Sequence, residues 1–173
     1  MGWETVLRRA EPGDELAVAE VHVRSWQVGY ENLLPSDYLD QLRPADRAKG
    51  YLFGEHDPAG PDTTLAEHGG RVVGFATIGP ELGRPGSDTG QLYALYVDPE
   101  HWGRGIGKAL IADAYHRFRL RGAKHAVLWV LVGNERAERF YRADGWHSDG
   151  LRSTEEVHGI SIDMVRYQRD LRA

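Results

Sequence analysis

The sequence predicts an α/β fold, with helices flanking a mixed sheet, in a single domain that spans residues 1–173. Strand-like and helix-like patterns alternate through most of the chain, and its C-terminal end is rich in strand patterns. A glycine-rich turn joins an apolar, strand-like run, residues 91–97, to a helical pattern that ends before Gly122. No break in composition, repeat or low-complexity segment marks a second domain, and a chain this long can bury roughly 70% of its unfolded surface.

The first half of the chain is expected to hold one long helix between strands. After the cap-like Pro12-Gly13-Asp14, apolar side chains recur at alternating three- and four-residue steps, which marks one face of a helix, at Leu16, Ala19, Val23, Trp26 and Tyr30. The other elements expected here are a strand at 5–9, short helices within 35–42 and 44–52, and a hairpin formed by 63–67 and 71–78 around His68-Gly69-Gly70.

The second half alternates strands and helices. Residues 79–90, with two prolines and four glycines, form a turn region rather than a linker between domains. The elements expected after it are a strand at 91–97, a helix from the glycine-rich turn to Arg121, a strand at 126–132, a helix at 134–143, and two last strands near 146–148 and 159–166.

Composition limits the environment and the partners of the protein. The chain has no cysteine, which excludes disulfides and thiolate chemistry, and its formal net charge of −5 argues against a nucleic-acid partner. No apolar run approaches the ~20 residues that span a membrane, and the N-terminus has no basic-then-apolar targeting signal. The eight histidines show no pair at i+3 or i+4 spacing, so no metal site is expected. We therefore expect a cytoplasmic protein without membrane association.

The glycine-rich turn Gly103-Arg104-Gly105-Ile106-Gly107-Lys108 is the most informative segment. A strand, a bare turn and a helix in this order bring backbone N–H groups together at a helix N-terminus, where they can hold a phosphate. The spacing fits neither common nucleotide motif. A dinucleotide fingerprint would need glycine at Lys108 or Leu110, and a phosphate loop would need glycine at Trp102 and a hydroxyl at Ala109. The turn predicts a phosphorylated cofactor; the alternative is a glycine-rich turn without a ligand.

A second motif follows the strand expected at 126–132. Its residues fit the pattern N-x-x-A-x-x-F-Y-x-x-x-G followed by an aromatic residue, at Asn134, Ala137, Phe140, Tyr141, Gly145 and Trp146. With the earlier turn in this order and separation, the chain resembles the GNAT superfamily of N-acetyltransferases, especially its small bacterial members. The turn matches the family at Gly105 and Gly107 but departs at Trp102, where Gln or Arg is usual. The resemblance covers most of the chain, including residues 23–35, which look like acceptor-side helices.

The resemblance implies details of the fold and of the cofactor site. It implies a mostly antiparallel sheet whose two central strands, residues 92–97 and 126–132, splay apart and leave a gap for the pantetheine arm of acetyl-CoA. Unpaired main-chain N–H groups of Leu95, Tyr96 and Val97 would then bind that arm and polarise the thioester carbonyl. The other residues expected to bind the cofactor are Gly103, Arg104, Gly105, Ile106, Gly107, Lys108 and Asn134, the last of which also caps its helix.

Tyr141 is the expected general acid, because a phenol with a pKa near ~10 stays protonated at neutral pH and can donate to a departing thiolate. The base is not identified by the sequence: Gln91 and Trp129 stand where relatives often carry Glu, and neither accepts a proton. A water chain to bulk solvent is our leading hypothesis. The polar groups Glu31, His22 and His158 are the alternatives, together with Tyr93. Trp26, Tyr30 and Tyr93 are candidate substrate contacts, although core packing is the stronger interpretation for Trp26 and Tyr30.

The function that the sequence predicts is transfer of an acetyl group from acetyl-CoA to a primary amine, on a small molecule or on a protein N-terminus or lysine. One alternative is a non-catalytic acyl-CoA-binding or regulatory module, suggested by the missing carboxylates. Another is a nucleotide-binding protein with a glycine-rich loop. The acceptor, the acyl length and the oligomeric state are not determined by the sequence, and a homodimer is compatible with it.

Overall fold

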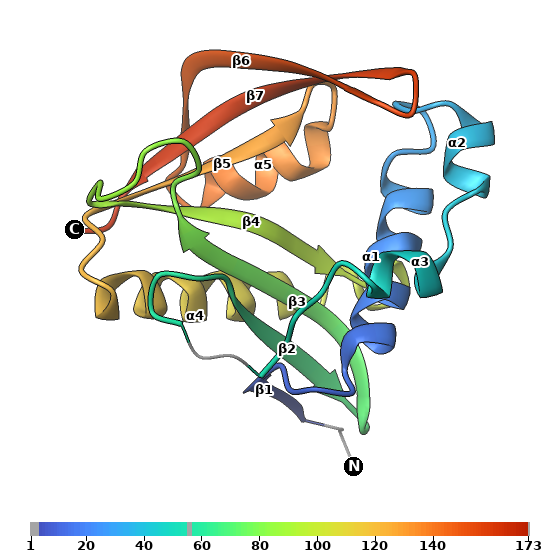
Figure 1. Ribbon diagram of the computed structural model, residues 1–173, viewed down its shortest axis with the longest axis horizontal. Helices are drawn as coiled ribbons and strands as arrows, with labels where there is room; N and C mark the ends of the chain where they lie inside the picture. Colours follow the sequence, from blue (N-terminus) through green and yellow to red (C-terminus); the bar gives the residue numbers. More distant parts are fainter. Residues whose placement is uncertain (1–3, 55–56, 173) are drawn as a thin grey trace.

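The computed structural model describes residues 4–54 and 57–172 and shows one twisted sheet with helices on both faces (Figure 1). The order of the seven strands in the described chain is β1-β2-β3-β4-β5-β7-β6, and each neighbouring pair is antiparallel except β4 and β5. The strands are β1 (Thr5–Arg9), β2 (Asp62–His68), β3 (Arg71–Pro80), β4 (Thr89–Val97), β5 (His125–Leu131), β6 (His147–Val157) and β7 (Ile160–Asp170). The mixed, mostly antiparallel sheet that the sequence predicts is confirmed.

The helices divide between the two faces of the sheet. They are α1 (Glu15–Gly29), α2 (Ser36–Asp40), α3 (Pro44–Ala48), the short 3₁₀ helix η1 (Pro99–His101), α4 (Ile106–Leu120) and α5 (Glu135–Ala143). A hydrophobic core lies on each face of the sheet, because successive side chains along a strand point to opposite faces. Phe75 packs with Val18 and Val21 of α1, whereas its neighbour Ala76 packs with Leu110 and Phe118 of α4.

The two central strands separate after their first three residues. Parallel pairing of β4 with β5 is confined to residues 89–91 of β4 and 125–127 of β5. Beyond this point β4 continues against β3 as far as Val97, and β5 continues against β7 as far as Leu131. The edges of β4 and β5 that face each other therefore lack a strand partner there, as the resemblance implied (Figure 1).

Several boundaries differ from the predicted ones. Strands β6 and β7 are 11 residues each; β6 is far longer than the predicted strand near 146–148, and β7 extends four residues beyond the predicted end at 166. Most of β6 is polar and solvent-exposed, so it lacks the apolar alternation on which a strand prediction depends. The short helix predicted within 44–52 is α3, Pro44–Ala48, which ends just before Gly50, and Leu52 beyond it is 87% exposed. Among the described residues, no helix is long and apolar enough to cross a membrane.

Candidate active site

A cavity of about 580 Å³ opens where β4 and β5 separate. One end is bordered by Trp102 and Gly107 at the start of α4, together with Phe140 of α5. The other end is bordered by Val28, Gly29 and Tyr30 at the end of α1. Its walls are the separated strands, so a long molecule could thread from α4 to α1 between them.

The glycine-rich turn forms the start of α4. Gly103 and Gly105 have φ values of +75° and +80°, a left-handed conformation that side chains disfavour, and Gly105 is the N-cap of the helix. The first helical backbone bond runs from Ala109 N–H to the Gly105 carbonyl at 3.1 Å, so the N–H groups of residues 106–108 have no acceptor within the helix. Such donors at a helix N-terminus can bind an anion.

The predicted turn residues contribute in different ways. Ile106 is 4% exposed and packs in the core beneath α4, so it can offer only its backbone N–H. The side chains of Arg104 and Lys108 are solvent-exposed and can reach an anion from outside. Gly107 faces the Phe140 ring of α5, and a Cβ at this position would lie 3.4 Å from it.

Trp102, where the chain departs from the family pattern, fastens this turn to the sheet. Its indole Nε1 donates a hydrogen bond of 2.8 Å to the Val97 carbonyl at the end of β4. The Arg136 guanidinium of α5 stacks over the indole ring, 3.3 Å from its centroid. Burial lowers the pKa of Arg136, and none of the described residues gives it an acidic partner. An uncompensated positive charge therefore lies at the cavity wall beside the turn.

The end of β4 is held by α1. The Ser25 hydroxyl donates to the Val97 carbonyl at 3.1 Å, and Arg24 forms an ion pair with the buried Asp98 carboxylate. Asp98 also accepts a 3.1 Å bond from the Glu100 N–H and so caps η1. These contacts fix the direction of the backbone that borders the cavity.

The direction of the β4 N–H groups can be assigned from one hydrogen bond. Asp98 N–H donates to the Val73 carbonyl of β3 at 2.7 Å. Because N–H groups alternate between the two edges of a strand, Tyr96 N–H also points to β3, whereas those of Leu95 and Val97 point towards β5 and the cavity. Three backbone N–H groups are predicted to face the gap between β4 and β5. The alternation directs those of Leu95 and Val97 into the gap and that of Tyr96 away from it. Tyr96 also lines the cavity, and its ring packs against Phe75.

Tyr141 and Asn134 reach the cavity from α5. Tyr141 is 9% exposed and packs against Phe140 and Trp146, with ring centroids 5.2 and 5.9 Å away. Burial raises the pKa of the Tyr141 phenol above its ordinary value, so the hydroxyl stays protonated at neutral pH. Asn134 Oδ1 accepts from Ala137 N–H at 3.2 Å, which confirms the cap, and the residue also lines the cavity.

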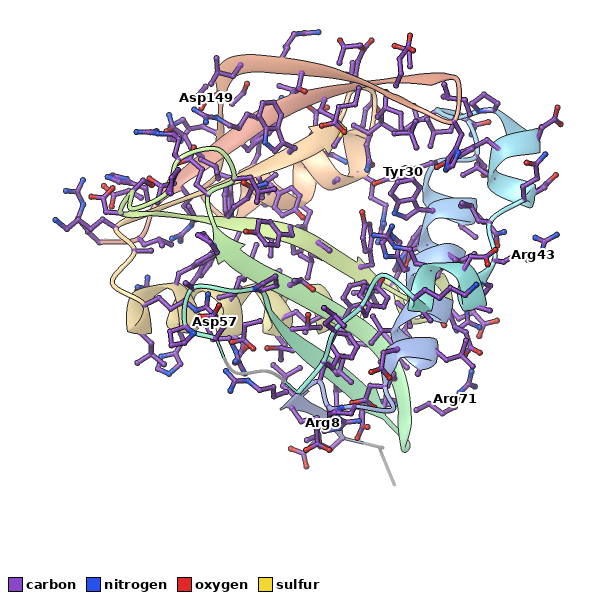
Figure 2. All side chains as sticks on the ribbon, in the orientation of Figure 1. Arg8, Tyr30, Arg43, Asp57, Arg71 and Asp149 are labelled. Carbon is purple, nitrogen blue, oxygen red and sulfur yellow. The ribbon has the colours of Figure 1, made fainter. Side chains whose placement is uncertain are left out.

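Tyr30 occupies the opposite end. Figure 2 shows its side chain extending from the end of α1 towards the centre of the molecule. Burial raises its pKa well above the ordinary value, and a hydrogen bond to Tyr96 adds to this effect. The Trp26 ring packs against the Tyr30 ring, with centroids 5.0 Å apart, and Trp26 is not among the residues that line the cavity. Tyr93 lines the cavity and donates its hydroxyl to the Pro80 carbonyl.

The sequence profile of the Acetyltransferase (GNAT) family matches residues 17–146. The chain belongs to this family. It is 28% identical over 164 residues to a protein of Mycobacterium tuberculosis named as a probable N-acetyltransferase, covering 94% of this chain and 91% of that one. It is 37% identical over 143 residues to the mycothiol acetyltransferase of Thermobispora bispora, covering 81% of this chain and 45% of that protein.

The fold is also that of known GNAT structures. The PaiA N-acetyltransferase from Thermoplasma acidophilum, solved in complex with coenzyme A, matches with a TM-score of 0.67 and 18% identity, covering 96% of this chain and 99% of that chain. The protein is thus an acetyltransferase of the GNAT family, and the cavity between β4 and β5 is its candidate active site.

The candidate bases of this GNAT chain lie apart from the cavity or are held in hydrogen bonds. Burial lowers the pKa of His22 to about 3, and its Nδ1 accepts from Arg47 at 3.2 Å and contacts the Tyr51 hydroxyl at 2.6 Å. Gln91 is buried, and its Oε1 accepts from Leu82 N–H at 3.0 Å. Glu31 and His158 are solvent-exposed and do not line the cavity. Within the described chain, no carboxylate lines it.

Three residues that sequence reasoning did not assign contribute to the site: Ser25, Asp98 and Arg136. Asp98 precedes a proline after a strand and could have been found as a helix cap. Arg136 stands inside the second motif, but an arginine in the first turn of a polar helix usually faces solvent, so nothing in the spacing places it on Trp102.

Proposed function

We propose that this protein transfers an acetyl group from acetyl-CoA to a primary amine by direct attack of the amine on the thioester. The observation that supports the proposal is the cavity itself, which extends from the glycine-capped start of α4, past the protonated phenol of Tyr141, to the end of α1. These are the features needed to hold a long thioester at one end and an amine at the other.

Acetyl-CoA fits the residues along the α4 end. The N–H groups of Ile106, Gly107 and Lys108 would bind its pyrophosphate, with Arg104 and Lys108 adding positive charge from the surface. Arg136 would place a further cation where the family usually has a Gln or Arg at the turn. The β4 edge and Asn134 would bind the pantetheine amides between the separated strands.

The chemistry requires charge stabilisation and two proton transfers. Leu95 or Val97 N–H would stabilise the negative charge on the thioester oxygen while the new C–N bond forms. As the C–S bond breaks, Tyr141 would donate its proton to sulfur and recover one from solvent. The proton released by the amine would leave through water, because no carboxylate lines the cavity in the described chain.

The lack of a carboxylate also supports one alternative, a non-catalytic module that binds acyl-CoA. Incubating the purified protein with acetyl-CoA and a panel of amines separates the two functions. Release of free CoA thiol together with acetylated amine is expected from the enzyme. Tight binding of acetyl-CoA by calorimetry, without product from any amine in the panel, would favour the non-catalytic module.

A further inference from the structure

The acceptor end of the cavity carries no charged side chain among the described residues. It is bordered by Val28 and Tyr30 of α1, Tyr93 of β4 and Trp129 of β5. The Tyr30 hydroxyl hydrogen-bonds to Tyr96, and the Tyr93 hydroxyl donates to the Pro80 carbonyl. The charged residues that line the cavity in the described chain are Arg136 and Arg139, both on α5 at the cofactor end.

Two acidic side chains, Glu81 and Asp149, are paired with an arginine on the strand beside Trp129. Arg166 of β7 is the cross-strand partner of Trp129, so both lie on the same face of the sheet. Its guanidinium forms ion pairs with Asp149 at 2.6 Å and with Glu81 at 3.2 Å, and both carboxylates are almost fully buried. Arg84 forms a second ion pair with Glu81, at 3.6 Å. Both carboxylates of this cluster are therefore already paired with arginine.

Apolar side chains are exposed close in sequence to Glu81 and Asp149, the two carboxylates paired with Arg166. Leu82 follows Glu81 and is 69% exposed, and Leu151 lies two residues after Asp149 and is 49% exposed. Val28 is 45% exposed at the cavity wall. Of these three residues, Val28 lines the cavity, and exposed apolar surface there is stabilised when the apolar part of a ligand covers it.

We propose that the acceptor is a monoamine on an apolar or aromatic body, and that the site discriminates against diamines and polyamines. This inference rests on the proposed function. One ammonium can lie against the Tyr30 and Trp129 rings before it loses its proton. A second ammonium would leave water without an anionic partner, in a cavity whose charged side chains are arginines.

A matched pair of substrates tests the inference: pentylamine and cadaverine have the same carbon chain and differ by one amino group. With acetyl-CoA saturating and thiol release as the readout, kcat/KM for pentylamine should exceed that for cadaverine by about tenfold or more. Phenethylamine should resemble pentylamine. A kcat/KM for cadaverine that equals or exceeds that for pentylamine overturns the inference, while acetyl transfer itself is then established. If no amine is acetylated although acetyl-CoA binds, the proposed function fails and the inference fails with it.

A charge placed on the wall gives a second, independent test. Val28→Glu adds a carboxylate at a partly exposed position of the acceptor wall, so it should reduce the preference for pentylamine over cadaverine by about threefold or more. Leu120→Glu is the matched control, because Leu120 is 73% exposed on α4 and does not line the cavity. It should leave the ratio unchanged. A ratio that stays at the parent value in Val28→Glu, or that moves equally in both variants, contradicts the proposal.

Discussion

Replacing Tyr141 by phenylalanine separates the proposed proton donor from its packing. The ring contacts to Phe140 and Trp146, at 5.2 and 5.9 Å, do not involve the hydroxyl. That hydroxyl hydrogen-bonds none of the residues that the structure describes. Because no buried hydrogen bond is lost, the free energy of unfolding should change by less than about 1 kcal/mol.

The effect on catalysis should be much larger than the effect on stability. General acid catalysis typically contributes ~10²–10⁴ in rate, and we expect the low end, about 10², because a thiolate with a pKa of about 8.5 is already a fair leaving group. The KM for acetyl-CoA should change little, because the ring and its contacts are kept. The loss in kcat should shrink for an acyl donor with a more acidic thiol.

Single-turnover measurements decide the outcome, since they separate the chemical step from product release. The parent protein and Tyr141→Phe are compared with acetyl-CoA and with the more acidic donor, and unfolding in urea is the control for folding. A phenylalanine variant that matches the parent rate while chemistry is rate-limiting would refute the proton-donor role. Tyr141 would then be a packing residue, and the thiolate would take its proton from solvent.

Three further outcomes follow from the same geometry. Gly105→Glu should abolish acetyl-CoA binding in calorimetry, because it puts a negative side chain at the N-cap proposed to bind the pyrophosphate; unchanged affinity would contradict the proposed phosphate site. With no carboxylate lining the cavity in the described chain, kcat/KM should keep rising towards the pKa of the amine, whereas a plateau near pH ~7 removed by one substitution would reveal a base. The low pKa of His22, about 3 when folded, means that the unfolded chain binds more protons below pH ~6.5. The free energy of unfolding should therefore fall by up to about 1.4 kcal/mol per pH unit as the pH drops from 6.5 towards 3, and His22→Leu should flatten this slope in urea titrations; an equal slope would assign it to other groups.

The parts of the site that sequence could predict are those fixed by local chemistry. Gly103 and Gly105 adopt positive φ, which is the reason that glycine marks such turns in a sequence. Asn134 caps α5 through its own side chain, a contact that spans only three residues. The order of strands and helices likewise follows from hydrophobic patterns that are each confined to one element.

The parts that could not be predicted depend on contacts between distant segments. The stacking of Arg136 on Trp102 joins α5 to the turn before α4, and neither segment alone indicates it. The direction of Tyr96 N–H follows from the register of β4 on β3, because a shift of one residue would reverse it. Strand β6 is set by pairing with β7 rather than by apolar residues of its own.

The proposed reaction takes place in the cavity between β4 and β5, where an acetyl group passes to an amine. The most direct test incubates the purified protein with acetyl-CoA and pentylamine and quantifies N-acetylpentylamine by mass spectrometry alongside free CoA thiol. N-acetylpentylamine and free CoA thiol should form in equal amounts, and the rates at which both form should fall together in Tyr141→Phe. Thiol released without acetylated amine, or no product while acetyl-CoA binds tightly, would contradict the proposed reaction.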